Sequence, residues 1–324
     1  MRLLVTGGAG YIGSVVAAQL LDAGHEVVVV DDLSTGYADA APAGARLVKA
    51  SLLDAPALAD VVGGGLDGVL HFAAKSLVGE SVEHPERYWR NNVTGTLALL
   101  EAMLAAGVPR LVFSSTAAVY GEPERTPITE DALTRPTSAY GASKLAVDAM
   151  IATFAQAHGL AATSLRYFNV AGASGRLGER HATETHLIPL VLQVAAGARE
   201  QVQLYGTDYP TPDGTAVRDY IHVEDLARAH LLALDAGQAG RHAVYNLGNG
   251  QGSSVREVIQ AAERVTGRAI KAVDAPRRAG DPAVLVASSE RIGAELGWAP
   301  AKPSLDDMVG DAWAWRQGPG RELA

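Results

Sequence analysis

Residues 6 to 13 of the chain read Thr6-Gly7-Gly8-Ala9-Gly10-Tyr11-Ile12-Gly13, directly after the short apolar run Leu3 to Thr6. The run has the length of a buried strand, and Tyr11 to Ala23 has a helical pattern that ends at Gly24. Glycines at 7, 10 and 13 fit a variant of the dinucleotide fingerprint, which needs a tight turn and a close backbone approach to pyrophosphate. The stretch therefore predicts a strand, a turn and a helix whose positive end binds a dinucleotide.

A carboxylate follows the second predicted strand. Glu26 to Val30 is an apolar run of strand length, and it ends in Asp31-Asp32. In a dinucleotide site, Asp31 can accept hydrogen bonds from both hydroxyls of the adenosine ribose, and it would repel a 2′-phosphate. No arginine follows directly to bind such a phosphate. The sequence therefore predicts NAD as the cofactor in preference to NADP.

The first half of the chain alternates between strand and helix patterns, which predicts an α/β fold with a doubly wound, Rossmann-type parallel sheet. We expect residues 1–170 to form the NAD-binding domain, with later returns near 216–250. Residues 171–324 are expected to form mainly a smaller C-terminal substrate-binding lobe, in which Gly172 to Gly178 is a loop. Further strands are expected at Val69 to Phe72, Arg110 to Ser114, Thr163 to Tyr167 and Val244 to Leu247, and helices at Tyr88 to Ala106, Ser138 to His158, His186 to Ala196, Asp225 to Ala236 and Ser254 to Gly267.

A tyrosine and a lysine are spaced to act at one catalytic site. The stretch Tyr140-Gly141-Ala142-Ser143-Lys144 opens a predicted helix, and positions four apart share a helix face. A phenol titrates near ~10, and a neighbouring cation favours its ionised form. We therefore predict Tyr140 as a general base whose pKa Lys144 lowers, with Lys144 also holding the nicotinamide ribose. Thr116 stands at a strand end facing the ligand crevice, where its hydroxyl can bind the substrate oxygen that Tyr140 deprotonates.

The composition excludes several classes of protein. The 324 residues are 48% hydrophobic, which is ample for a core, and the net charge of −9 without a basic run disfavours a nucleic-acid partner. The absence of cysteine excludes thiolate catalysis and cysteine-based metal sites, and we expect no metal site and a cytoplasmic location. Met1 to Val5 runs into the glycine stretch too soon for a signal peptide, and no apolar stretch could cross a bilayer, so no membrane partner is expected.

Several motifs together resemble the extended short-chain dehydrogenase/reductase family, and within it most closely the UDP-glucose 4-epimerases. The similarity covers almost the whole chain. Thr6 to Ser14 and Asn91-Asn92-Val93 occur family-wide, whereas Val217 to Val223 together with Arg278 is much more specific. The other matching stretches are His71-Phe72-Ala73-Ala74, Val78-Gly79-Glu80-Ser81, Tyr140 to Lys144, Arg166-Tyr167-Phe168-Asn169, Tyr245-Asn246-Leu247-Gly248 and Pro276-Arg277-Arg278.

The resemblance implies an enzyme that interconverts UDP-glucose and UDP-galactose. It implies transient oxidation at sugar carbon 4 by NAD+, rotation of the 4-keto sugar and return of the hydride to its other face. Beyond Tyr140, Lys144 and Thr116, it implies cofactor contacts at Gly7, Gly10, Tyr11, Ile12, Gly13, Asp31, Asp32, Ser51, Leu52, Phe72, Ala73, Ala74, Asn91, Ser114 and Tyr167. It implies substrate contacts at Asn169, His186, Leu187, Tyr205, Arg218, Tyr220, Arg278, Asp281 and Leu285, with the two arginines on the diphosphate.

The chain departs from its relatives at three places. Thr116 stands where relatives often have Ser, and Ser51 stands where they often have an Asp that contacts adenine. Some relatives carry a Lys at the position of Ser76, whereas this chain has Lys75 one residue earlier.

Three other functions have to be distinguished from this one. Nucleotide-sugar 4,6-dehydratases place an Asp-Glu pair directly after the strand-end Thr, and Ala117-Ala118 stand there in this chain. The alternatives left open are a 4-epimerase for UDP-N-acetylhexosamines, pentoses or uronic acids, and a catalytically silent NAD-binding sensor.

The resemblance also implies a homodimer and a graded sugar preference. In relatives, the helices that match Asn92 to Ala106 and Ser138 to His158 pair across a two-fold axis as a four-helix bundle. Leu285 lies four places after Asp281, where relatives have a wall of the sugar pocket. A Tyr there goes with exclusion of an N-acetyl group and a small residue with its acceptance. Leu285 therefore implies a preference for UDP-glucose and UDP-galactose over their N-acetylated counterparts.

Overall fold

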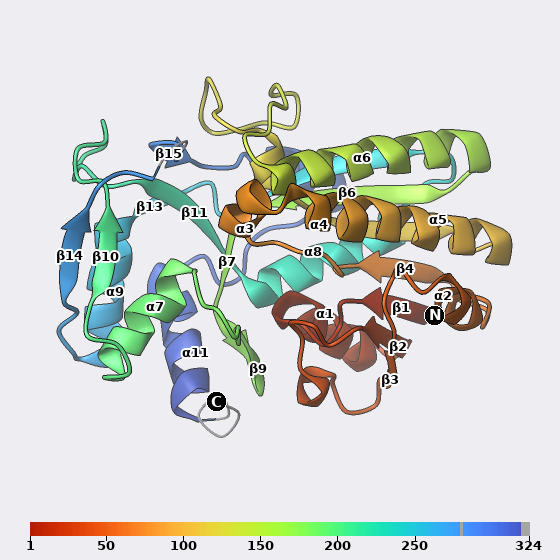
Figure 1. Ribbon diagram of the computed structural model, residues 1–324, viewed down its shortest axis with the longest axis horizontal. Coiled ribbons are helices and arrows are strands. Elements are labelled where there is room, and N and C mark those ends of the chain that lie inside the picture. Colours follow the sequence, from red (N-terminus) through yellow and green to blue (C-terminus); the bar gives the residue numbers. More distant parts are fainter. Residues whose placement is uncertain (279–280, 319–324) are drawn as a thin grey trace.

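A parallel sheet of seven strands forms the centre of the molecule in the computed structural model, which describes residues 1–278 and 281–318 (Figure 1). The predicted doubly wound sheet is confirmed. The chain starts at β1 and builds outward in both directions, so the connections diverge between β1 and β4 and open a crevice at the carboxyl ends of these strands. In spatial order the strands are β12 (His242–Leu247), β6 (Ala161–Tyr167), β5 (Arg110–Thr116), β4 (Gly68–His71), β1 (Arg2–Thr6), β2 (Glu26–Asp31) and β3 (Arg46–Lys49).

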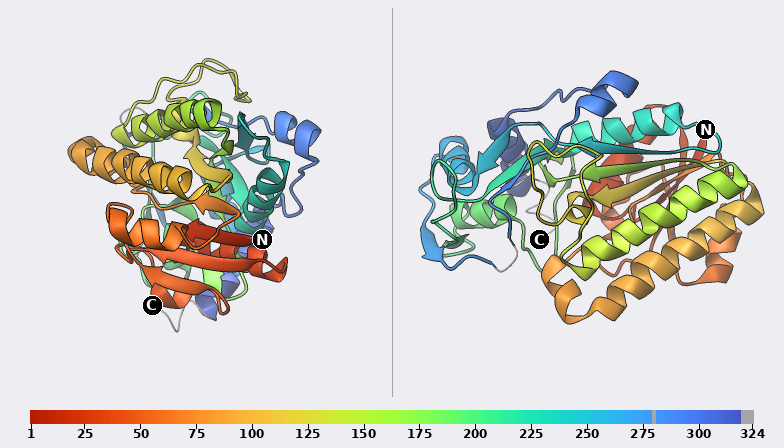
Figure 2. Two further views of the ribbon diagram at one scale, coloured as in Figure 1. Left: turned by 90° about the vertical axis from the view of Figure 1, so that its right-hand side faces the viewer. Right: turned by 90° about the horizontal axis from the view of Figure 1, so that it is seen from above.

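Alternating side chains of the strands build two apolar layers. Leu3 and Val5 of β1 point into one cluster and Leu4 into the other, because successive side chains of a strand face opposite sides. Seen end-on, helices therefore cover both faces of the sheet (Figure 2). One face carries α1 (Tyr11–Asp22), α8 (Val223–Ala236) and α10 (Glu290–Leu296), and the other carries α2 (Ala55–Val62), α5 (Gly95–Ala106) and α6 (Ala139–His158).

The helix that the sequence predicts from Tyr88 to Ala106 is present, but it is not α-helical throughout. The structure has α3 (Val78–Glu83), α4 (Pro85–Tyr88) and then a π-helical turn, η2 (Trp89–Thr94), before α5 begins. Such wider turns break the regular helical spacing and occur often at functional sites. Here the turn contains Asn92, whose amide donates to the Lys75 carbonyl and to the Ser143 hydroxyl and whose oxygen accepts from the Lys75 N–H. Asn92 thereby fastens the segment after β4 to α6.

The rest of the chain forms a second lobe at the carboxyl ends of the central strands, shown on the left of Figure 1. Two small sheets lie there, β7 (Asn169–Ala171), β11 (Val217–His222), β13 (Gly252–Ser254) and β15 (Val284–Leu285) in one, and β10 (Val202–Tyr205) with β14 (Ala272–Ala275) in the other. The expected loop at Gly172 to Gly178 is wrong in part, because a short hairpin forms there between β8 (Ala173–Ser174) and β9 (Leu177–Gly178). The remaining elements are η1 (Ala38–Ala40), η3 (Ala117–Val119), α7 (Leu187–Ala195), α9 (Val255–Thr266) and α11 (Leu305–Gln317).

The helices α5 and α6 run beside one another along the outside of the sheet (Figures 1 and 2). Leu97 and Leu104, seven residues apart on α5, are 36% and 47% exposed although both are large and apolar. Within the described residues, every helix is too short or too polar to cross a membrane.

Candidate active site

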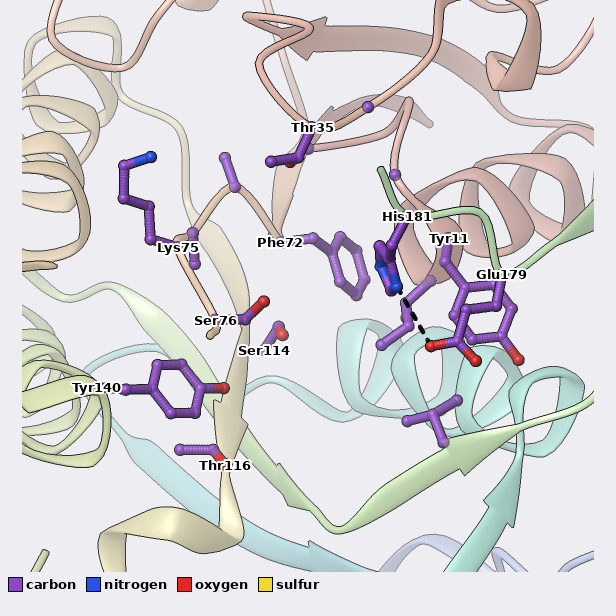
Figure 3. A pocket seen from close by; sticks show the side chains of 18 of the residues that line it. Tyr11, Thr35, Phe72, Lys75, Ser76, Ser114, Thr116, Tyr140, Glu179 and His181 are labelled. Atoms are coloured by element: carbon purple, nitrogen blue, oxygen red, sulfur yellow. Dashed lines mark ion pairs between the residues drawn. The ribbon is translucent and has the colours of Figure 1, made fainter. Parts of the chain in front are cut away.

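One cavity of about 490 Å³ lies where the carboxyl ends of the central strands meet the second lobe. The strand ends contribute Asp31, Phe72 and Ser114, and the second lobe contributes Glu179 and Leu285. Figure 3 shows Tyr140, Thr116 and Ser114 at one end of the cavity and Tyr11, Glu179 and His181 at the other. The two ends of the cavity are therefore lined by different side chains, so they can bind different chemical groups.

The glycine turn after β1 leaves no room for side chains. Gly7 has a φ of +71°, and a Cβ on it would lie 2.6 Å from the Ala73 nitrogen. A Cβ on Gly13 would lie 2.3 Å from the Gly7 oxygen. Gly10 is the N-cap of the 12-residue helix α1 and has no side chain to cap it, and residues 10–13 line the cavity, so the uncapped end of α1 adjoins the cavity. This uncapped positive helix end fits the diphosphate of a dinucleotide.

Asp31 is held in place at the end of β2. It is 7% exposed, and its two carboxylate oxygens accept one backbone N–H each, from Ala9 at 3.0 Å and from Leu33 at 2.9 Å. Burial raises the pKa of Asp31, and the two N–H groups oppose that rise. Leu33 has the left-handed φ of 59°, which turns the chain sharply around the carboxylate. Each oxygen keeps a free lone pair toward the cavity, as a ribose diol requires.

The predicted catalytic pair lies at the start of α6. Ser138 caps this helix by accepting the Gly141 N–H at 3.2 Å, which fixes the first turn and Tyr140 within it. Lys144 follows one turn later and its Nζ donates to the Ser114 carbonyl at 2.8 Å. This bond holds the Lys144 ammonium at the end of β5, and Lys144, Ser114 and Tyr140 all line the cavity.

Burial controls the acid–base state of this pair. Lys144 is 3% exposed, and burial lowers its pKa to about 7, although the nearby Asp148 opposes that change. Burial also raises the pKa of Tyr140, and a hydrogen bond with the Thr116 hydroxyl works in the opposite direction. The phenol stays protonated in this environment until further positive charge favours its ionised form.

Asp148, one turn after Lys144 on α6, was not predicted. Its Oδ2 accepts from Arg166 Nε at 3.0 Å and Nη2 at 2.9 Å, and both side chains are buried. This forked ion pair joins α6 to β6 and places a negative charge close to the lysine.

The predicted diphosphate ligands gather at the rim of the second lobe. Arg218 of β11 forms an ion pair with Asp281, and the Arg278 guanidinium lies 4.0 Å from the centre of the Tyr205 ring. The same strand β11 pairs with β7 and with β15, so that Arg218 lies beside Leu285 in the register.

The family model for the NAD dependent epimerase/dehydratase family matches residues 3–248 of this chain. The chain belongs to this family. Membership makes NAD its cofactor, in agreement with the glycine turn and Asp31.

Relatives within the family extend the match over the whole chain. A protein of Corynebacterium glutamicum named UDP-glucose 4-epimerase is 59% identical, over 99% of this chain and 97% of that protein. The structure of UDP-glucose 4-epimerase from Brucella ovis in complex with NAD superposes with a TM-score of 0.93, at 44% identity and 97% coverage of both chains. The structure of the Bifidobacterium longum enzyme in complex with NAD+ and UDP gives a TM-score of 0.92, at 38% identity and 98% coverage of both chains.

Most residues that the sequence nominates line the one cavity. Ser51 does not, and its hydroxyl accepts the Leu53 N–H at 3.2 Å instead. The rim residues Tyr205, Arg218, Arg278 and Asp281 also lie outside the cavity lining. The nominated residues in the lining are Gly7, Gly10, Tyr11, Ile12, Gly13, Asp31, Asp32, Leu52, Phe72, Ala73, Ala74, Asn91, Ser114, Thr116, Tyr140, Lys144, Tyr167, Asn169, His186, Leu187, Tyr220 and Leu285.

Two further groups line the cavity without having been predicted. Ser34, Thr35 and Gly36 follow Asp31-Asp32, and a polar turn close behind the carboxylate predicted to bind ribose is the signal that could have found them. Glu179 and His181 come from the segment between β9 and α7. The sequence signal for Glu179 and His181 is a short stretch with several histidines and glutamates. This stretch begins directly after the predicted loop from Gly172 to Gly178.

Proposed function

We propose that this chain interconverts UDP-glucose and UDP-galactose by epimerising the sugar at carbon 4. The observation that carries the proposal is the meeting of the Tyr140 phenol and the Thr116 hydroxyl in the cavity, with Lys144 held at the end of β5. Relatives at up to 60% identity bear the name UDP-glucose 4-epimerase, which supports the same reaction.

The side chains divide the work at carbon 4. Thr116 binds the 4-hydroxyl oxygen, and Tyr140 removes its proton as general base. NAD, which the glycine turn and Asp31 would hold, would supply the redox chemistry, the removal of hydride from carbon 4 and its return to the other face of the sugar. Burial alone keeps Tyr140 protonated, so the positive charges of Lys144 and the oxidised nicotinamide are needed to lower the phenol pKa. The same phenol returns the proton when the 4-keto sugar is reduced.

The residues after Thr116 favour epimerisation over dehydration. Ala117 and Ala118 line the cavity beside Thr116, where a dehydratase needs an acid and a base to remove water. Methyl groups exchange no proton, and they leave space in which a sugar ring can rotate.

The rim group anchors the UDP part during that rotation. Arg218 and Arg278 present forked donors that match phosphate oxygens, and Tyr205 offers an aromatic face to uracil. Asn169 and Tyr220 are register partners in β7 and β11, and both line the cavity between the rim and Tyr140. Binding energy far from carbon 4 keeps the keto intermediate from escaping.

Leu285 sets the substrate preference in this proposal. It lines the cavity and packs into an apolar cluster with Val119 and Tyr120, so its side chain forms a firm wall beside Thr116. We propose good turnover of UDP-glucose and UDP-galactose and weaker turnover of their N-acetylated counterparts.

We also propose a cytoplasmic homodimer that acts in galactose metabolism. Leu97 and Leu104 leave an apolar strip on α5 that a second copy of the helix pair α5 and α6 can cover. Light scattering is expected to give a dimer, and a Leu97→Glu/Leu104→Glu variant is expected to give a monomer. A natural protein that is monomeric at micromolar concentration contradicts this part of the proposal.

The reaction is tested by incubating the purified protein with UDP-glucose and separating the products. We expect UDP-galactose to form without added NAD, because the cofactor is regenerated in each turnover. Panels of UDP-N-acetylhexosamines, UDP-pentoses and UDP-uronic acids run in parallel. Bound NAD without turnover of any UDP-sugar would instead establish a silent NAD-binding sensor.

A further inference from the structure

The segment between β9 and α7 brings together four side chains that ligate metals. Glu179, His181, Glu184 and His186 each offer one ligand atom, and these atoms all lie within 4.8 Å of one another. Glu179, His181 and His186 also line the cofactor cavity. Figure 3 shows Glu179 and His181 facing each other at the far end of the cavity from Tyr140. The described part of the chain holds no second group of this kind.

Three contacts in this cluster have the length expected between two ligands of one tetrahedral ion, with Glu184 turning a different oxygen toward each imidazole. Ligands at ~2.0–2.2 Å from a tetrahedral ion lie ~3.3–3.6 Å from one another. The His181 Nδ1 lies 3.5 Å from Glu179 Oε1 and 3.4 Å from Glu184 Oε2, and the His186 Nδ1 lies 3.3 Å from Glu184 Oε1. The contact of 2.6 Å between His186 Nδ1 and Glu179 Oε1 is instead the length of a charged hydrogen bond.

The two carboxylates of the cluster lie close together and mostly out of water. The side chains of Glu179 and Glu184 are only 10% and 8% exposed, and two carboxylates so placed repel each other. Arg316 of α11 interacts electrostatically with Glu184 from one side. A divalent cation between the two carboxylates supplies positive charge that offsets this repulsion.

We propose that Glu179, His181, Glu184 and His186 form a tetrahedral binding site for a divalent transition metal of the zinc type. Two imidazole nitrogens favour such an ion over Mg²⁺ and Ca²⁺, which prefer oxygen ligands in larger coordination shells. The proposal departs from the expectation of no metal, which rested mainly on the missing cysteines.

The proposed metal is structural, because four protein ligands leave no open coordination position. It closes the segment 179–186 over the cofactor cavity. Arg180 of this segment already reaches across to Asp39, and its guanidinium lies 3.5 Å from the centre of the Tyr37 ring. His186 directly precedes α7, so the metal also fixes the first turn of α7 and with it Leu187. Metal binding through Nδ1 leaves the His186 Nε2 able to donate a hydrogen bond to a ligand.

The test measures metal binding directly, in the absence of any sugar nucleotide, so it is independent of the proposed reaction. The protein with its bound cofactor is dialysed against a chelator, and ZnCl₂ is then titrated by calorimetry. We expect one Zn²⁺ per chain, with no comparable binding of Mg²⁺ or Ca²⁺. Co²⁺ at the same site is expected to show the intense visible absorption of tetrahedral coordination. Absence of saturable Zn²⁺ binding to the natural protein overturns the proposal without reference to any variant.

Variants then locate the site. Loss of outer-shell partners alone weakens metal binding by ~10–100-fold, so His181→Gln and Glu184→Gln are each expected to weaken Zn²⁺ binding by at least ~100-fold. His84→Gln is the matched control, because His84 is an exposed histidine that also lies beside a carboxylate, 3.8 Å from Glu86. Limited proteolysis should cut the segment 179–186 faster in the metal-free protein. Zn²⁺ binding that is unchanged in both His181→Gln and Glu184→Gln rules out this site.

Discussion

The two ends of the ligand site are built in different ways. At the cofactor end, the glycine turn and Asp31 lie at the ends of the neighbouring strands β1 and β2, Lys144 lies in the second turn of α6, and all of them line the cavity. At the rim, Arg218 and Asp281 come from distant segments and already form an ion pair with each other. The cofactor end is therefore preorganised by the sheet, whereas a diphosphate at the rim has to share or replace an existing partner of Arg218.

The largest expected effect lies at the preorganised end. Tyr140→Phe removes the only proposed base, and loss of a general base lowers the rate by ~10²–10⁴-fold. Binding of UDP is expected to remain near normal, because the phenol is not part of the rim. The measurements are kcat for UDP-galactose formation and the Kd for UDP. Tyr245→Phe is the matched control, since that phenol bonds to Glu295 at 2.7 Å, far from the cavity.

Two substitutions of Thr116 test whether its hydroxyl takes part in the same step. Thr116→Ser keeps the hydroxyl and should leave kcat within a few-fold, whereas Thr116→Val keeps the shape and should lower kcat by ~10²-fold, as for loss of one transition-state hydrogen bond. Equal activity of the two variants argues that the hydroxyl takes no part in the reaction.

The next largest effect is expected at the rim. Arg218→Ala removes one charged donor to phosphate and leaves Asp281 without its partner. Hydrogen bonds to charged groups contribute about 1.5–3 kcal/mol, so the Kd for UDP should rise by ~10–100-fold. The kcat at saturating substrate should change little, in contrast to Tyr140→Phe. Arg264→Ala, which breaks the exposed ion pair with Asp306, is the control. A large loss of kcat in Arg218→Ala would erase the distinction between the two ends.

Leu285 belongs to both regions, because it lines the cavity and is the register partner of Arg218. Substitutions of Leu285 are expected to change activity less than those of Tyr140 or Arg218. One misfitting methylene-sized group changes discrimination by ~1–3 kcal/mol, so Leu285→Cys should shift the ratio of kcat/KM toward N-acetylated substrates by about tenfold, and Leu285→Tyr should shift it the other way. The ratio is measured for both substrate pairs in all three proteins. An unchanged ratio in both variants means that another residue forms the gate.

The smallest effect concerns stability and pH. The pKa of Lys144 falls on burial from 10.5 to about 7, so between these values the unfolded chain binds more protons than the folded one. The contribution of Lys144 to the free energy of unfolding therefore rises with pH across this range. The cofactor-free Lys144→Met variant should melt a few degrees above the natural protein at about pH 7, and this difference should shrink by about pH 10. A difference that grows with pH contradicts the buried-cation interpretation.

The same contrast explains what the sequence could predict. Gly7 to Gly13, Asp31 and the pair Tyr140 and Lys144 are local patterns, and parallel topology alone brings them to one edge of the sheet. The π-helical turn within the predicted helix from Tyr88 to Ala106 was not predicted, because a single such turn hardly changes the apolar periodicity. The segment around Glu179 and His181 escaped for another reason. Its position in the cavity lining depends on tertiary contacts with distant parts of the chain, and no periodic pattern in the sequence encodes such contacts.

The buried carboxylate of Asp219 gives β11 a property useful to protein engineers. It accepts backbone N–H groups from Ala287 at 3.0 Å, Asn249 at 2.7 Å and Gly250 at 3.1 Å, and so ties the strand to two later parts of the chain. Arg218 and Leu285 are neighbours across this tie. The distance between Arg218 and Leu285 is therefore set by the main-chain pairing of β11 with β15. A substitution at Leu285, the proposed sugar-facing residue, is therefore expected to leave the position of Arg218, the proposed phosphate ligand, unchanged.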